Sequence, residues 1–410
     1  MKKTLIAVAA LAATASFAQV TIYGLVDIGY GTHNTTSRNS AVFTKSSGVM
    51  DGANAGNRIG FRGTEDLGGG LSADFLIEQG ISPTNGALFG VRSGAAGHQY
   101  DGFSASGSAA AASGTAGAYS QGTNRQSFLG VKGGMGTVRI GYQYTNLYEL
   151  STLAGFVQGS EGTPGADKAH THGNAAVGGT RANGLTYISP TMNGVTVQVQ
   201  TGAFTGREDV TSNTAITASG LSVDKNNRMG IMVKYASGPV ALAFAHTKAD
   251  MQASVIASGL ATRTNVYGAL IAAATSATTN AAERSASLNQ VGGSYTMGAA
   301  KVGFTYNKGD NGGSTTSTVA TDYKAYNISA SYALGAYSPF VSMGRADSKL
   351  SSTGALSEDY KLAQAGVRYN LSKRSVAYVM HGITQNNAVS ADTTAGFKDQ
   401  KTIIGLSHSF

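Results

Sequence analysis

The sequence predicts an all-β fold, specifically a 16-stranded antiparallel transmembrane β-barrel. Apolar and polar residues alternate in sixteen segments, and the turns between them are alternately short and long. No apolar run in the chain is long enough for a membrane helix. Composition agrees, because 13% charged residues and a mean hydropathy of −0.07 fit neither a disordered chain nor a helical membrane protein. The absence of Cys excludes disulfide frameworks and thiol catalysis.

The chain begins with a segment typical of export. Lys2 and Lys3 provide a positive start, residues 5–13 form an apolar core, and small residues stand three and one positions before a cleavage point after residue 18. This is the pattern of a secretory signal peptide, whose core is too short to anchor in a bilayer. We therefore expect a signal peptide at 1–18 and one barrel domain at 19–410.

Strands with one apolar and one polar face are indicated by period-two alternation. Residues 300–307 are the clearest case, with Val302, Phe304 and Tyr306 on one face against Lys301, Gly303, Thr305 and Asn307 on the other. Arg58 and Arg62 likewise fall opposite Ile59 and Phe61. We expect glycines on the polar faces to leave room inside the barrel, namely Gly60, Gly141 and Gly303.

Seven short turns and eight long loops separate the sixteen expected strands. The short turns lie at 65–70, 132–136, 190–194, 237–239, 298–299, 334–336 and 372–373. The long loops lie at 32–56, 82–123, 145–180, 205–226, 249–285, 309–322, 346–358 and 385–397. An even strand number with short turns at one rim and long loops at the other is typical of barrels that span a membrane.

Tyrosines recur at one height, three residues before five of the short turns. They are Tyr187, Tyr235, Tyr295, Tyr332 and Tyr369. Their recurrence against the turns predicts an aromatic girdle at a membrane–water interface.

The last segment predicts closure of the barrel. Alternate residues from Thr402 to Phe410 share one face, and pairing of this segment with residues 20–30 would leave no open sheet edge.

Several stretches resemble the general diffusion porins of Gram-negative outer membranes, most closely the β-proteobacterial branch that includes the neisserial porins. The matching stretches are residues 20–24, 58–68 (RIGFRGTEDLG), 124–134 (NRQSFLGVKGG), 187–190 (YISP), 367–374 (VRYNLSKR) and 405–410 (GLSHSF). They follow one another in the order expected for the family.

This resemblance implies a homotrimer in the outer membrane, with the third long loop, 145–180, folded into the lumen of the barrel. Arginines on the wall would then face carboxylates on that loop at a constriction. The resemblance also makes loop 82–123 a candidate for the contact that latches onto a neighbouring subunit.

Five arginines are candidates for the constriction wall: Arg58, Arg62, Arg125, Arg139 and Arg181. Alternation directs Arg58, Arg62 and Arg139 inward, whereas Arg125 and Arg181 match wall arginines of the family by local context. Alternation leaves Arg125 open, because the apolar Leu129 shares its parity. The sequence departs from the family at Tyr142, where many members have arginine. A single such arginine could instead be solvated or paired with lipid phosphates.

The candidate constriction loop contributes Glu149, Glu161, Asp167 and Lys168. Rings of basic residues favour anions in a channel and rings of acidic residues favour cations. The excess of wall arginines therefore predicts a weak to moderate anion preference. His170 and His172 lie in the same loop, where a solvated position is favoured over a metal site because catalytic zinc takes three protein ligands.

The expected function is passive diffusion of small hydrophilic solutes and ions through a water-filled channel. A substrate-specific channel is the alternative, with Tyr23 and Tyr323 as candidate aromatic contacts. We expect lipid, lipopolysaccharide and the barrel-assembly machinery as partners, the last through a C-terminal signal at Leu406, His408 and Phe410. No enzymatic activity, cofactor, metal or nucleic-acid partner is expected.

Overall fold

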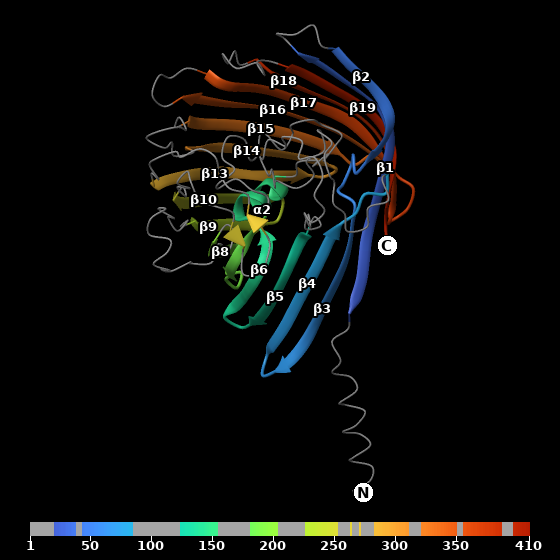
Figure 1. Cartoon of the computed structure of the whole chain (residues 1–410). Coiled ribbons are helices and arrows are strands. Elements are labelled where there is room, and N and C mark those ends of the chain that lie inside the picture. Colours follow the sequence, from blue (N-terminus) through green and yellow to red (C-terminus); the bar gives the residue numbers. More distant parts are fainter. Residues whose placement is uncertain are drawn as a thin grey trace, which may run out of the picture.

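A computed structural model describes residues 20–37, 43–84, 124–154, 181–203, 226–252, 263–264, 270–271, 283–310, 321–350, 356–387 and 397–410. Strands make up nearly all of this part of the chain, and they follow one another around a single barrel (Figure 1). The first ten strand segments are β1 (Thr21–Ser37), β2 (Phe43–Asp51), β3 (Arg58–Gly68), β4 (Leu71–Gly80), β5 (Asn124–Gly133), β6 (Gly136–Tyr144), β7 (Arg181–Ile188), β8 (Val195–Ala203), β9 (Asn226–Ser237) and β10 (Val240–Gln252).

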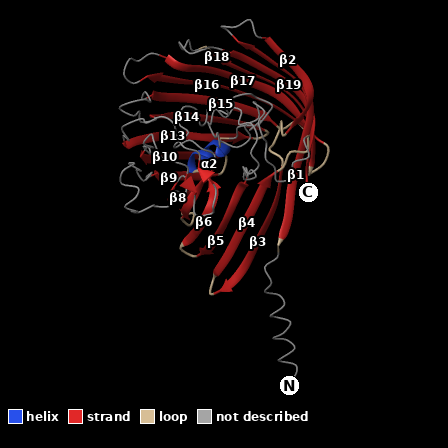
Figure 2. Ribbon diagram, in the orientation of Figure 1, coloured by secondary structure: helices blue, strands red, loops and turns tan. Residues whose placement is uncertain are grey.

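Seven more strands complete the wall. They are β13 (Glu283–Met297), β14 (Ala300–Asp310), β15 (Thr321–Tyr332), β16 (Tyr337–Leu350), β17 (Leu356–Asn370), β18 (Ser375–Asn386) and β19 (Phe397–Ser409). A separate two-stranded pair, β11 (Arg263–Thr264) with β12 (Leu270–Ile271), is also described. One short helix, α2 (Asn146–Leu153), completes the described elements (blue in Figure 2).

The wall contains seventeen strand segments but sixteen strand positions. The outer part of β1 pairs with β2, and its beginning pairs with β3, so β2 and β3 form one strand interrupted at residues 52–57. Each remaining strand pairs antiparallel with the next one along the wall, and β19 pairs with β1. The predicted closed 16-stranded antiparallel barrel is therefore confirmed.

The closing seam has the predicted partners. Leu25 lies opposite Ser409 and Thr32 opposite Thr402, and the backbones of Gly24 and Phe410 exchange two hydrogen bonds of 3.1 Å. Pairing of the last strand with the first leaves no backbone donors or acceptors at an open edge, as a hydrocarbon environment requires.

The two faces of the wall differ as the alternation predicts. In β14, Val302, Phe304 and Tyr306 are exposed on the outer face, whereas Gly303 and Thr305 are buried on the inner face. Across the described strands the exposed large side chains are mostly apolar, and many buried side chains are polar. In an ordinary globular protein the apolar side chains are buried and the polar ones exposed. The reverse distribution is expected for a barrel wall with lipid outside and water inside.

Some long loops are shorter than the sequence suggests. The predicted loop 32–56 contains the end of β1 and all of β2, and only residues 351–355 separate β16 from β17. These corrections arise because strands in a tilted barrel continue beyond the apolar band, where their polar sequences no longer alternate.

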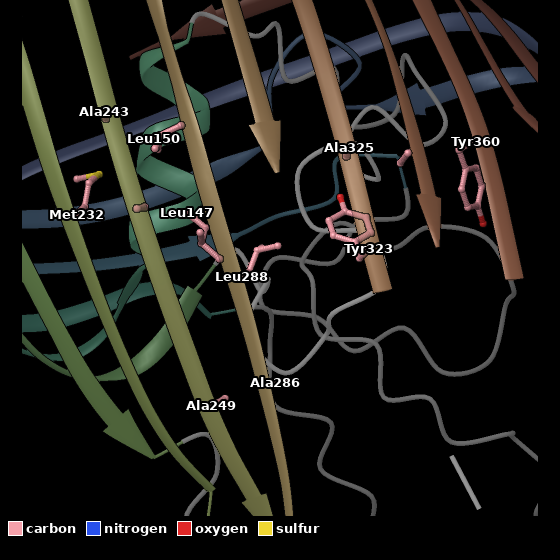
Figure 3. Packing of buried hydrophobic residues seen from close by; sticks show 12 residues of the cluster. Leu147, Leu150, Met232, Ala243, Ala249, Ala286, Leu288, Tyr323, Ala325 and Tyr360 are labelled. Atoms are coloured by element: carbon pink, nitrogen blue, oxygen red, sulfur yellow. The ribbon is translucent and has the colours of Figure 1, made fainter. Parts of the chain in front are cut away.

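Helix α2 lies inside the ring of strands, at the start of the third long loop (Figure 1). Thr145 caps it by accepting a 3.2 Å hydrogen bond from the backbone N–H of Tyr148. Leu147 and Leu150 are fully buried against inner-face residues of β9, β10 and β13, including Met232, Ala243 and Leu288 (Figure 3). Residues 155–180 lie outside the described part, so the inward fold of the whole loop stays a prediction.

Polar contacts hold the helix on the same wall. Gln198 donates a 2.8 Å hydrogen bond to Asn146, and Gln290 donates a 2.9 Å hydrogen bond to Ser151. Among the described residues, no helix is long and apolar enough to cross a bilayer.

Candidate functional site

Glu78 on β4 joins two of the predicted wall arginines. Arg125 donates from Nε to Glu78 at 2.7 Å, and a guanidinium nitrogen of Arg58 lies 3.9 Å from the same carboxylate. Tyr23 on β1 donates a 2.9 Å hydrogen bond to Glu78. Both Glu78 and Arg125 are buried, so this is a fixed ion pair rather than a mobile surface contact.

Tyr144 at the end of β6 extends the cluster to a third arginine. Its hydroxyl accepts a 3.2 Å hydrogen bond from Arg125, and the guanidinium of Arg181 lies 4.9 Å from the centre of its ring. Its ring also stacks on Tyr148 of α2, with 4.4 Å between the ring centres. Arg58, Arg125 and Arg181 therefore form one network with Glu78 and Tyr144 across adjacent strands β3 to β7.

A β-bulge settles the orientation of Arg125, which alternation left open. Gln126 pairs with Glu78 and Asn124 with Gln79, so Arg125 is an extra residue in β5. Leu129 is 57% exposed on the outer face, whereas Arg125 contacts Glu78 on the inner face. The bulge breaks the period-two pattern just before the regular part of the strand and thus allows both orientations.

The other two wall arginines also lie on the inner face. Arg139 on β6 approaches Asp74 on β4 at 3.3 Å and lies 4.5 Å from the ring centre of Phe128. The guanidinium of Arg62 lies 5.2 Å from the ring centre of Tyr23. Arg139 is thus paired with its own carboxylate, whereas Arg62 reaches the Glu78 cluster through Tyr23.

Of the predicted loop residues, the structure describes Glu149 on α2. Desolvation raises the pKa of Glu149 above its ordinary value, and a hydrogen bond from Gln198 with the charges of Arg139 and Lys234 offsets part of this effect. Glu161, Asp167 and Lys168 lie outside the described residues, as do His170 and His172.

Two inner-face carboxylates, Asp74 and Glu78, were missed by the sequence analysis. The signal was present, because both share one parity of β4, opposite the exposed Ile77. Their partners could not be predicted from the sequence of β4 alone. Glu78 pairs with arginines on β3 and β5, and Asp74 pairs with an arginine on β6. These two carboxylates make the net positive charge of the wall smaller than the number of its arginines suggests.

The five tyrosines of the predicted girdle lie on the outer face beside the short turns. Each ring is between 37% and 50% exposed, and Tyr187 donates a 2.7 Å hydrogen bond to the backbone of Met135 in a turn. Leu406 and Phe410 of the C-terminal strand are also exposed on this face. Tyr323, a candidate solute contact, is instead 1% exposed within the inner apolar cluster.

Comparison with known proteins agrees with this architecture. The chain is 33% identical over 142 residues to the major outer membrane protein P.IB of Neisseria gonorrhoeae, which is 34% of this chain and 32% of that protein. It is 40% identical over 99 residues to an outer membrane porin protein of Bordetella pertussis, covering 21% of this chain and 26% of the relative. The chain thus spans about a third or less of the length of the curated relatives that it matches.

Similarity in structure extends over almost the whole chain. An anion-selective porin from Comamonas acidovorans superposes with a TM-score of 0.64 at 20% identity, covering 96% of this chain and all of that one. At this identity the likeness shows the fold alone. The family assignment comes from the sequence, because residues 5–389 match the profile of the Gram-negative porins. The chain belongs to the Gram-negative porin family.

Proposed function

We propose that the protein is a general diffusion channel of the outer membrane, through which small hydrophilic solutes and ions pass passively. The observation that supports this most strongly is the arginine network on the polar inner face of a closed barrel. A 16-stranded barrel has an interior wider than its own wall side chains can fill, so inner-face charges can act on a solute in water. No chemical step, cofactor or metal is part of the proposal.

The balance of wall charges supports an anion preference. Five arginines line β3 to β7; Glu78 contacts Arg58 and Arg125, Asp74 pairs with Arg139, and Glu149 lies close enough to Arg139 to feel its charge. Since Glu78 is shared by Arg58 and Arg125, its single negative charge offsets only one of these two positive charges, which supports an anion preference. Arg58→Glu should therefore lower anion preference more than Lys349→Glu, whose side chain is exposed on the outer face near the loop rim.

The remaining assignments concern the surroundings of the channel. The exposed tyrosines beside the turns suit an aromatic girdle at the membrane interface. Leu406, His408 and Phe410 would form the assembly signal in the closing strand, recognised by the barrel-assembly machinery. We propose a homotrimer in contact with lipid and lipopolysaccharide; a structural neighbour, OmpT of Vibrio cholerae, is described in a trimer form.

Solute uptake into proteoliposomes tests the function. A general diffusion channel should give swelling rates that fall smoothly as solute size increases, because the lumen acts by sieving. Sugar isomers of equal mass should enter at equal rates. Rapid entry of one isomer, inhibited by excess of the same sugar, would instead support the substrate-specific channel. Burial of Tyr323 argues against that alternative, because a buried ring offers no stacking surface to a passing sugar.

A further inference from the structure

The interruption between β2 and β3 projects into the barrel. Six residues, 52–57, lie between Asp51, which pairs with Ile28, and Arg58, which pairs with Leu25. Two residues of β1 thus face six residues of the neighbouring strand, and the excess chain must leave the sheet. We call residues 52–57 the inner bulge.

Apolar packing fixes the inner bulge to the inner face. Ala53 is fully buried among Phe340 on β16, Tyr378 and Met380 on β18, and Ile403 on β19. These four side chains alternate with exposed residues such as Ile404 and Val379, so they belong to the inner side of the wall. The bulge therefore folds inward and across the seam of the barrel.

Asp27 on β1 organises the backbone of the inner bulge. Its carboxylate accepts hydrogen bonds from the N–H groups of Asn54, at 3.0 Å, and Ala55, at 2.7 Å, and a third from the hydroxyl of Tyr378, at 2.6 Å. Its own N–H donates to the side chain of Asn57. Asp27 is fully buried, so these bonds fix the bulge in one position.

The inner bulge brings arginines from distant strands onto one segment. Arg58 donates a 3.1 Å hydrogen bond to the carbonyl of Gly56, and Arg125 packs beside the same glycine. From the other side, Arg368 on β17 donates a 2.6 Å hydrogen bond to the side chain of Asn54. Arg368 is half-buried on the inner face, where it adds a cation that the wall assignment above does not include.

The main anchors of the bulge and of helix α2 lie half a circumference apart, and Arg125 with Tyr144 links the two elements on the β5–β6 side. The bulge is anchored on β1, and the helix packs against β9, β10 and β13. Eight strand positions separate β1 from β10 in either direction around the sixteen-stranded wall, which is half its circumference. Two inward elements whose anchoring strands lie half a circumference apart reduce the free width of the lumen.

We propose that the inner bulge is a second, fixed narrowing of the channel, that Asp27 is its positioning residue, and that Arg368 contributes to anion preference there. The proposal rests on the channel function above. Asn54, Ala55 and Gly56 are half-buried, whereas Ala53 and Asn57 on either side are buried, so a passing solute would meet residues 54–56 first.

Chemical modification tests the narrowing, because the chain has no Cys of its own. Ala55→Cys should lose conductance on reaction with a bulky methanethiosulfonate reagent, whereas Lys349→Cys on the outer face should keep it. Unchanged conductance of modified Ala55→Cys would overturn the narrowing while leaving the channel function intact, since that function fails only if the wild-type barrel does not conduct.

Two further experiments test Asp27 and Arg368. The cysteine of Ala53→Cys should be inaccessible to the reagent, and it should become reactive when Asp27→Asn is added. Equal reactivity with and without Asp27→Asn would show that Asp27 does not position the bulge. Arg368→Gln should lower the anion-to-cation permeability ratio roughly twofold, the effect of one charge about 8 Å from an ion in water. The matched Lys349→Gln should change it little, and equal shifts would exclude Arg368 from the selectivity.

Discussion

Glu78 offsets part of the positive charge that two arginines place on the inner face. It contacts Arg125 and Arg58 and accepts a hydrogen bond from Tyr23, so one carboxylate offsets part of the charge of two guanidinium groups. Alternation in β4 was enough to predict that Glu78 faces inward. Its partners could not be predicted, because they come from three other strands. The same limit applies to Arg125, whose inward orientation depends on a bulge that only the pairing with β4 reveals.

Glu78→Gln should raise the anion preference of the channel. The substitution keeps the hydrogen-bonding shape of the side chain but removes a negative charge, which at about 8 Å in water amounts to about 0.5 kcal/mol and a roughly twofold change in permeability ratio. Reversal potentials in a KCl gradient measure the shift. The control is Glu65→Gln, which removes the same charge from an exposed position near a short turn. Equal shifts for both variants would contradict the proposed wall.

Glu149 should make the selectivity depend on pH. Desolvation raises its pKa, so as pH falls it becomes neutral at a higher pH than an ordinary glutamate, and the lumen loses a negative charge. Because the folded state then binds a proton more readily than the unfolded state, the contribution of this group to stability is complete at low pH and is lost as pH rises through the folded pKa. Arg139 and Lys234 face this carboxylate and oppose the shift.

Reversal potentials recorded between about pH 7 and pH 4 measure this effect, because the acidic pKa of a glutamate lies in that range. Anion preference should increase on acidification in the wild type, with a smaller increase in Glu149→Gln. Identical pH profiles for the two proteins would show that Glu149 does not face the ion path.

At the scale of elements, the strands were predictable and the inward segments were not. Alternation in 300–307 predicted the two faces of β14 correctly, since each residue of a strand faces either lipid or lumen. Helix α2 and the inner bulge obey no such period. They are determined by what they contact across the lumen, including the apolar inner-face patch around Leu288, which the sequence analysis did not anticipate.

Glycines on the wall illustrate the difference. Gly303 was expected to keep the lumen wide, but a side chain there would collide with the carbonyl of Ala154 at the end of α2, and one at Gly292 would press on Leu150. These glycines lie where the helix approaches the wall most closely. Their smallness therefore serves the docking of α2.

Leu150→Ala should loosen α2 from the wall. Truncation of a fully buried leucine leaves a cavity and costs about 2–5 kcal/mol in soluble proteins. We expect a lower free energy of unfolding in lipid vesicles and greater fluctuation of the open-channel current. Leu334→Ala, in an exposed short turn, is the control. Current noise as low as in the wild type would show that the helix is held by its polar contacts instead.

At the scale of the whole molecule, closure of the barrel explains the composition. An outer face in contact with lipid and a polar inner face give moderate hydropathy at low charge, and the exposed apolar residues form the outer surface. Removal of the predicted signal peptide leaves 28 basic and 22 acidic residues, a formal charge of +6. We expect that excess to affect permeation only where it lies on the inner face, as the arginines of β3 to β7 do.

Planar-bilayer recording tests the account most directly. A water-filled passive channel with an excess of cations at its wall should give conductance that increases linearly with KCl concentration, and a reversal potential of anion-selective sign in a KCl gradient. Conductance that saturates with salt, or a reversal potential of cation-selective sign, would contradict it.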